Sequence, residues 1–154
     1  MTFALVVSSY HEFVTKRLEA GARAALREAG VADSDVSTFV APGAFELAQA
    51  ARHLAETGAW SGIVCLGCLI KGETPHFDYI ARAAADGIMR AAQDTGVPVT
   101  FGVLTTNTAE EALARAGDDS SNKGSEAARA AFEMATLYRR ITERSTAGAP
   151  PRSR

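Results

Sequence analysis

The sequence predicts a single α/β domain with a four-stranded parallel sheet that is covered by helices on both faces. The 154 residues suit one hydrophobic core. Short apolar runs alternate along the chain with longer amphipathic segments. The apolar runs are hydrophobic at nearly every position, which is typical of parallel strands buried on both sides.

The strands and helices follow from these two patterns. The expected strands span residues 3–9, 35–41, 61–70 and 97–106. The expected helices span residues 12–30, 44–58, about 75–94, a short segment after residue 108, and 125–142. With right-handed crossovers, few topologies remain, and we expect a doubly wound sheet of the flavodoxin type.

Residues at the ends of these segments support the helix boundaries. Gly30, Gly58 and Gly96 stand where the helical periodicity stops, as C-terminal glycines do. Thr74 suits an N-cap and Pro75 the first helical position of the third helix. For the fourth helix, either Asn107 or Thr108 is expected as the cap, because a glutamate lies three residues after each.

The last twelve residues, "ERSTAGAPPRSR", contain three arginines, two prolines and no apolar run. We expect the folded domain to span residues 1–142 and the tail 143–154 to be disordered and outside the core. A basic tail can contact RNA, although a solvated end is the simpler interpretation.

The composition excludes several classes of protein. Hydrophobic residues make up 47% and charged residues 22%, as in soluble globular domains, and the net charge is −2. No broad positive field favours nucleic acid or an anionic membrane, and no apolar run is long enough to span a bilayer. The start, "MTFALVVSSYHE", lacks the basic residues and cleavage site of a secretory signal, so we expect a cytoplasmic protein.

Cys65 and Cys68 have the C-x-x-C spacing of redox and metal sites. They lie in the apolar run "GIVCLGCLI", which is a predicted strand. Residues three apart on a strand point to opposite faces, so these thiols are expected to be buried and separate.

The unusual polar and aromatic residues follow the strands. The segments "SSYHE", "PGAFE" and "KGETPH" come after the first three strands, and "FGVLTTN" includes the end of the fourth. In open parallel sheets, ligands bind outside the carboxyl ends of the strands. The positions of these residues and the rule for parallel sheets therefore both place a site at the carboxyl edge of the sheet.

The segment "KGETPH" predicts an anion site beside a proton-transfer group. Gly72 lets the backbone approach a ligand, and the Thr74 hydroxyl with the first helical amides can hold a phosphate. His76 lies at the positive end of the helix dipole, which favours a neutral ring that accepts a proton. The simpler alternatives are that Thr74 only caps the helix and that His76 has a structural role. His11 and His53 lack ligand-like spacing to His76, so no metal site is expected.

Other candidate residues have weaker individual signals. Phe45 and Glu46 can supply an aromatic wall and an acceptor for ligand hydroxyls, and Tyr10 can stack on a flat heterocycle. Arg115 and Lys123 flank a polar loop and can bind phosphate. The simpler readings are a core phenylalanine, a favourable first-turn carboxylate and ordinary surface charges.

Four motifs, "PGAFEL", "GCLIKGETPHFDYI", "PVTFGVLTT" and "ALARAGDDSSNKGSEAA", together resemble the 6,7-dimethyl-8-ribityllumazine synthase family over roughly residues 3–140. The resemblance implies condensation of 5-amino-6-(D-ribitylamino)uracil with 3,4-dihydroxy-2-butanone 4-phosphate, with loss of phosphate and water, in riboflavin biosynthesis. It implies no metal and no organic cofactor.

The resemblance also implies roles for individual residues. His76 matches the proton-transfer histidine, and Tyr10 falls where an aromatic ring stacks on the pyrimidine. The phosphate cradle corresponds to Arg115, Gly72, Glu73 and Thr74. The ribityl chain is held by Phe45 and Glu46, beside Ala44. The pocket is further lined by Leu69, Ile70 and Lys71. A neighbouring subunit contributes Phe101 and Lys123.

The chain departs from the family pattern at several of these motifs. Ser9-Tyr10-His11 replaces the usual Arg-Phe-Asn, Lys71 replaces an arginine, Ala48 replaces a proline, and Asp118-Asp119 adds negative charge near the expected phosphate site. Two alternatives therefore stay open: a paralogue acting on a related diamine, and a non-catalytic binder of lumazine or flavin. Because the first strand begins near Phe3, we expect a pentamer or decamer, with sites shared between neighbours, rather than a sixty-subunit shell.

Overall fold

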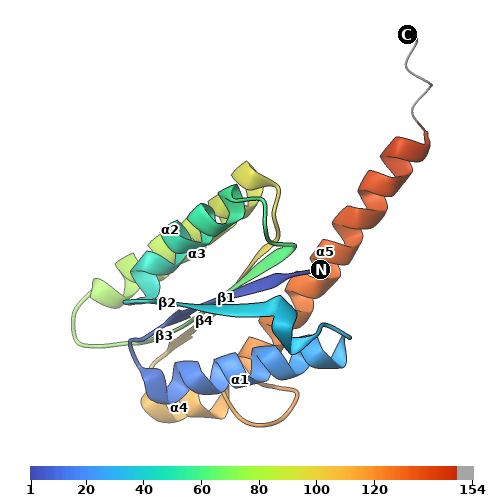
Figure 1. The fold of residues 1–154 in the computed structure, drawn as a ribbon. Coiled ribbons are helices and arrows are strands. Elements are labelled where there is room, and N and C mark those ends of the chain that lie inside the picture. Colours follow the sequence, from blue (N-terminus) through green and yellow to red (C-terminus); the bar gives the residue numbers. More distant parts are fainter. Residues whose placement is uncertain (149–154) are drawn as a thin grey trace.

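The computed structural model describes residues 1–148 and confirms the predicted three-layer α/β architecture (Figure 1). All four strands are parallel and lie in the order β2-β1-β3-β4, which is the flavodoxin-like order. Their bounds are β1 (Phe3–Ser8), β2 (Val36–Ala41), β3 (Gly62–Ile70) and β4 (Val99–Thr106).

Within the described residues, five helices and one 3-10 turn connect and cover the strands. They are α1 (Glu12–Glu28), η1 (Asp33–Asp35), α2 (Ala44–Glu56), α3 (His76–Thr95), α4 (Ala109–Ala114) and α5 (Lys123–Ala147). Figure 1 shows α2 and α3 on one face of the sheet and α1, α4 and α5 on the other. None of the helices within residues 1–148 has the length and apolar character needed to cross a bilayer.

The core consists of two layers, one on each side of the sheet. Leu5 and Leu66 pack with Leu18 of α1 on one side, whereas Val6 and Ile63 belong to the layer that packs against α2. Both layers are fully buried because alternate strand residues face opposite helices.

The two cysteines follow the same alternation. Cys65 belongs to the layer beneath α2, and Cys68 belongs to the layer beneath α1 and α5. Both are free and buried, so the predicted separation of the two thiols is confirmed.

The predicted helix ends are correct at the glycines and wrong at the start of α3 and at both ends of α5. Gly30, Gly58 and Gly96 have positive φ and follow the ends of α1, α2 and α3, as expected. Thr74 is not the N-cap of α3: Pro75 takes that position with ψ of 2°, and the helix begins at His76.

The C-terminal helix is longer than expected at both ends. It begins at Lys123 rather than at residue 125, and it continues to Ala147 rather than stopping at Thr142. No glycine or proline stands between Thr142 and Gly148, which is consistent with the helical first residues of the expected tail. They are exposed and do not pack on the core. The remainder of the expected tail, 149–154, lies outside the described residues.

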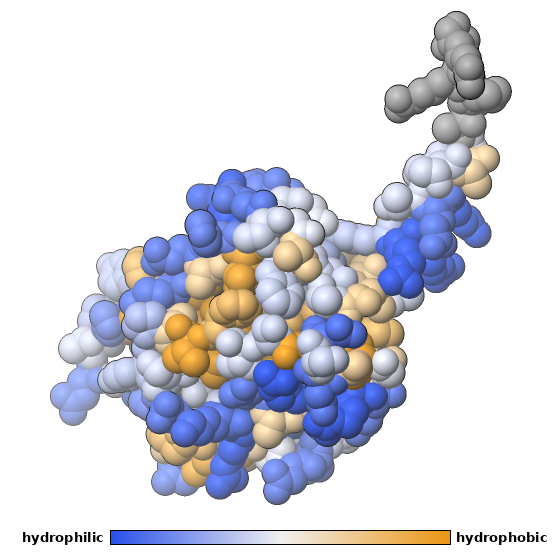
Figure 2. Space-filling view, viewed as in Figure 1, coloured by the Kyte–Doolittle hydropathy of each residue, from blue (hydrophilic) through white to orange (hydrophobic). Residues whose placement is uncertain are grey.

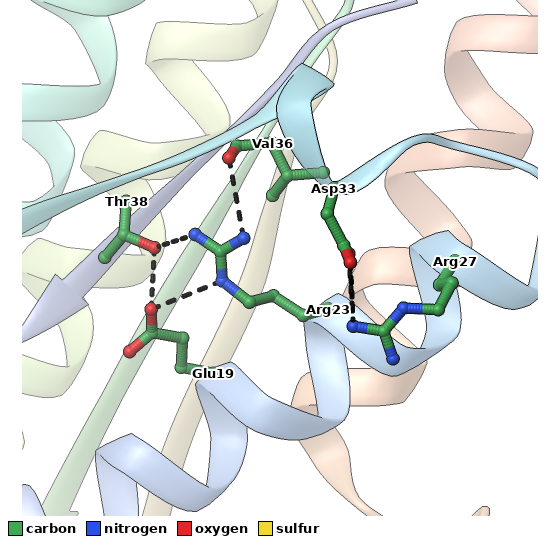
Figure 3. A network of polar contacts seen from close by, with 6 residues as sticks. All are labelled: Glu19, Arg23, Arg27, Asp33, Val36 and Thr38. Carbon is green, nitrogen blue, oxygen red and sulfur yellow. Dashed lines mark hydrogen bonds and ion pairs between the residues drawn. The ribbon is translucent and has the colours of Figure 1, made fainter.

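A polar network fixes the edge strand β2 against α1 (Figure 3). The guanidinium of Arg23 donates to the Thr38 hydroxyl at 2.7 Å, and that hydroxyl donates to Glu19 at 2.6 Å. Arg27 pairs with Asp33 in the turn before β2 at 3.1 Å. These contacts hold the strand whose carboxyl end leads into the "PGAFE" segment.

Candidate functional site

A cleft of about 810 Å³ opens at the carboxyl ends of β1, β2 and β3. The chain proceeds outward from β1 to β2 on one side of the sheet and from β3 to β4 on the other. The cleft lies at the switch point between β1 and β3, which is where doubly wound sheets bind ligands. Its lining comes from the segments after these three strands and from the start of α3: Tyr10, His11, Pro42, Gly43, Ala44, Phe45, Glu46, Cys68, Leu69, Ile70, Gly72, Thr74, His76, Phe77, Tyr79 and Ile80.

Most residues expected in the substrate site line this cleft. They are Tyr10, Ala44, Phe45, Glu46, Leu69, Ile70, Gly72, Thr74 and His76. Lys71 and Glu73 are exposed and do not line it. The amide of Lys71 donates to the carbonyl of Thr106 at 2.8 Å, so its backbone extends the pairing of β3 with β4.

Aromatic rings form two walls of the cleft. Tyr10 is 65% exposed and Phe45 is 56% exposed, although both residues have large apolar surfaces. Exposed rings that line a cleft can stack on a flat ligand, which would cover them.

Glu46 presents an acceptor without a partner. It lies in the first turn of α2, where its carboxylate is favoured by the helix dipole. Its Oε2 atom is buried and has no hydrogen-bond partner among the described residues. Buried polar atoms are nearly always satisfied, so this oxygen is suited to accept a hydrogen bond from a ligand hydroxyl.

The start of α3 combines a proton-transfer group with a potential anion site. No side chain in the described part of the chain caps its N-terminus, so the first amides of the helix remain available to a ligand. Thr74 and His76 are both exposed and line the cleft beside these amides. A phosphate bound there would lie near an imidazole that can donate or accept a proton.

Sequence reasoning missed several lining residues. Tyr79 and Ile80 lie three and four positions after His76 on α3, so they share its face of the helix. This spacing is a signal that was present in "HFDYI". Cys68 also lines the cleft, but burial raises the pKa of its thiol to about 11. The thiol is therefore protonated at neutral pH and is not a nucleophile.

A second hollow, of about 630 Å³, lies between α3, β4 and α5, and we call it the β4 groove. It is lined by Phe101, Arg115 and Lys123 together with apolar residues such as Met89. Within one chain, Arg115 thus lines a different hollow from Gly72 and Thr74, because it follows β4 at the end of α4 whereas the other two follow β3.

Among the described residues, the two cations of the β4 groove form side-chain contacts that are exposed to solvent. Arg115 donates to the carbonyl of Glu111 at 3.2 Å, and the Lys123 ammonium lies 2.8 Å from the Glu126 carboxylate. The hydrogen bond and the charge of Lys123 lower the pKa of Glu126. Such exposed pairs are weak, so a phosphate can compete for both cations.

Asn122 positions this groove, and sequence reasoning missed it. Its Oδ1 caps α5 by accepting from the amides of Gly124 and Ser125 at 2.8 and 3.1 Å. Its amide group donates to the carbonyls of Arg17 and Gly117. The side chain is buried, and a Cβ at Gly124 would collide with the backbone of Leu18, so α5 starts tightly against α1.

A metal is not favoured by these side chains. Among residues 1–148, no three His, Cys, Asp or Glu side chains are grouped so that they could hold a metal ion.

Comparison with known proteins identifies the family. The chain matches the family model for 6,7-dimethyl-8-ribityllumazine synthase over residues 1–139. It is 45% identical over 141 residues to a 6,7-dimethyl-8-ribityllumazine synthase from Syntrophus aciditrophicus, covering 92% of each chain. It is 47% identical over 139 residues to one from Salinibacter ruber, covering 90% of this chain and 89% of the relative. The chain therefore belongs to the 6,7-dimethyl-8-ribityllumazine synthase family.

Proposed function

We propose that this chain condenses 5-amino-6-(D-ribitylamino)uracil with 3,4-dihydroxy-2-butanone 4-phosphate to form 6,7-dimethyl-8-ribityllumazine in riboflavin biosynthesis, releasing phosphate and water. Membership of the family identifies the chain as an enzyme of lumazine synthesis. The observation that carries the proposal is one cleft that combines a stacking ring, an unpaired carboxylate and a histidine beside free helical amides. We also propose that the protein acts in the cytoplasm, as expected from the sequence.

Each part of the cleft suits one part of the substrates. The Tyr10 ring stacks on the pyrimidine, and Phe45 and Glu46 hold the ribityl chain through apolar contact and hydrogen bonds to hydroxyls. Gly72, Thr74 and the amides at the start of α3 hold the phosphate. Bringing both substrates together in this way removes much of the entropic barrier to a bimolecular reaction.

His76 moves the protons that the chemistry requires. The substrate amine attacks the ketone carbon, a carbon–nitrogen bond forms, and water leaves after the carbonyl oxygen is protonated. Phosphate then leaves with its bonding electron pair as a proton is lost from the adjacent carbon, and ring closure expels water. An imidazole beside the phosphate site can accept and return these protons.

We propose that the complete site contains the cleft of one chain and the β4 groove of a neighbour in a pentamer or decamer. Among residues 1–148, no arginine or lysine lines the cleft of a single chain, whereas the groove holds Arg115 and Lys123 beside Phe101. Apolar side chains near both hollows are exposed, including Tyr79 at 73% and Met89 at 58%. A second copy would cover this surface and bring the two cations to the phosphate.

The edge of the sheet offers further apolar surface to a second copy. Figure 2 shows a hydrophobic band between more polar helices on the side where β2 lies. Val40 of this edge strand is 70% exposed and Phe39 is 39% exposed. Contiguous apolar surface of this kind is typical of protein contacts.

The acidic loop gives little support to the alternative that the chain acts on a related diamine. Asp118 and Asp119 line a separate hollow between α1 and α5 rather than the groove with Arg115 and Lys123. The Asp119 carboxylate accepts hydrogen bonds from Ser121, which lower its pKa. Its charge is thus engaged within the loop.

The test is a spectrophotometric condensation assay with both substrates, beside Arg115→Ala and His76→Ala. Rapid lumazine formation that Arg115→Ala nearly abolishes is the expected result. A wild-type rate equal to the spontaneous reaction would contradict the proposal. Tight binding of lumazine without turnover would then establish the alternative of a non-catalytic binder.

A further inference from the structure

The three-residue connection Ser9–His11 between β1 and α1 contains an unusual backbone conformation. His11 has φ 60° and ψ 50°, in the left-handed region, and it is the one non-glycine residue with positive φ within residues 1–148. Asn, Asp and His are the residues that tolerate this region best. Such backbone conformations persist only where the surrounding structure imposes them, and they cluster at functional sites.

Several hydrogen bonds hold the residues just before His11 in place. The amide of Ser9 donates to the carbonyl of Ala41 at 2.8 Å, and the Ser9 hydroxyl donates to the carbonyl of Pro42 at 3.2 Å. The amide of Tyr10 donates to the buried Ser8 hydroxyl at 3.2 Å. The connection is therefore tied to the segment that carries Phe45 and Glu46 on the other side of the cleft.

The His11 side chain then contacts the ring that forms the first wall. Its ring centroid lies 4.5 Å from that of Tyr10, with the planes at 66°, and 5.8 Å from that of Phe13, at 89°. Both are edge-on arrangements of the kind that aromatic pairs favour. Burial lowers the pKa of His11, which favours the uncharged ring in this aromatic setting.

We propose that His11 is a positioning residue that fixes the Tyr10 ring in the orientation needed to stack on the heterocyclic substrate, an inference that rests on the proposed function. Tyr10 is 65% exposed, so few other contacts restrict its ring. The left-handed turn directs the chain from the cleft into α1, and the imidazole supports Tyr10 from one side. His11 thereby sets affinity for the heterocycle rather than for the phosphate ester.

Two substitutions separate the backbone from the ring. His11→Asn keeps a residue that tolerates positive φ but removes the aromatic contact, whereas His11→Phe keeps a ring but is unfavourable at positive φ. Each variant and the matched control His53→Asn, which changes an exposed histidine on α2, are assayed for kcat, for both KM values and for Tm. The affinity of the fluorescent product 6,7-dimethyl-8-ribityllumazine is measured by titration.

For His11→Asn, we expect the KM for the ribitylaminouracil and the Kd of the product to rise about 3- to 10-fold, as the loss of one aromatic pair would cause. The KM for the butanone phosphate, kcat and Tm should stay near wild-type values. For His11→Phe, the heterocycle KM should stay near wild type while Tm falls.

The outcomes distinguish this inference from the proposed function. If wild-type protein forms lumazine and His11→Asn leaves the heterocycle KM unchanged, or raises both KM values equally, the positioning role is wrong while the function stands. If wild-type protein forms no lumazine, the proposed function is overturned and this inference with it.

Discussion

The cleft at the ends of β1, β2 and β3 and the β4 groove differ in what they can do to a substrate. The cleft has aromatic walls, the unpaired oxygen of Glu46 and the imidazole of His76, but no arginine or lysine of the described part of the chain lines it. The groove has an exposed cation, Arg115, a half-buried one, Lys123, and an exposed ring at Phe101. Under the proposed function, the groups for recognition and proton transfer are thus separated within a single chain from the cations that would bind phosphate.

This separation has a topological cause. The cleft lies beyond the carboxyl ends of the central strands, whereas the groove lies along the edge strand β4, between α3 and α5. A heterologous contact, repeated around a ring, would place each groove against the next cleft. The following predictions test whether the two hollows form one site and what each contributes.

The largest effect is expected from removing the cation with the best geometry for phosphate. Arg115→Ala should lower kcat/KM by about 100-fold or more, because a bidentate guanidinium contact with phosphate is lost. Arg115→Lys should recover only part of the activity. Steady-state kinetics check this, with Arg144→Ala on the exposed end of α5 as the control. A loss below threefold would show that the groove does not bind the phosphate ester.

Asn122→Ala should destabilise the groove and leave the cleft intact. We expect the free energy of unfolding to fall by about 2–4 kcal/mol, because a helix cap is lost and buried backbone groups lose their partners. Thermal unfolding should shift downward by about 5–10 °C. Asn122→Asp, which keeps the cap acceptor, should lose less. Equal stability of both variants and wild type would contradict the role assigned to Asn122.

His76→Ala should lower kcat by about 10- to 100-fold, at the lower end of general acid–base catalysis, because the amine and ketone also react without the enzyme. His53→Ala, on the exposed face of α2, should have wild-type kinetics. Measured kcat and KM separate the two effects: a change confined to KM would show that His76 binds substrate without moving protons.

Glu46→Gln should have the smallest effect of the four. It keeps the shape of the side chain but removes the charge that strengthens hydrogen bonds to hydroxyls, so KM for the ribityl substrate should rise about 10-fold. The KM for the butanone phosphate should change little. Equal changes in both KM values would contradict a contact with the ribityl chain.

The strands could be predicted because local patterns determine them, and the handedness of crossovers then left few orders for the sheet. Strands buried on both faces are apolar throughout, and glycines with positive φ follow α1, α2 and α3. The placement of Cys65 and Cys68 on opposite faces of the sheet follows from the alternation of side chains along a strand. Thr108 was one of two expected caps, and its hydroxyl accepts from the amide of Glu111 at 3.1 Å.

Features that depend on distant segments could not be predicted in this way. Asn122 lies in a polar stretch that reads as a solvated loop, and its burial comes from contact with α1, about a hundred residues earlier. The unpaired oxygen of Glu46 and the left-handed turn at His11 likewise depend on neighbouring segments. The separation of Arg115 from Thr74 appears only when the segments after β3 and β4 are placed in space.

The most direct test of the shared site is complementation between two inactive variants. A cleft variant, Glu46→Ala with His76→Ala, and a groove variant, Arg115→Ala, are each purified, unfolded, mixed in equal amounts and refolded together. If neighbouring chains form each site, random assembly should restore about one quarter of wild-type activity, because that fraction of sites combines an intact cleft with an intact groove. Each variant refolded alone should remain inactive. If the mixture shows only the sum of the two separate activities, the cleft and the groove do not form one site between chains.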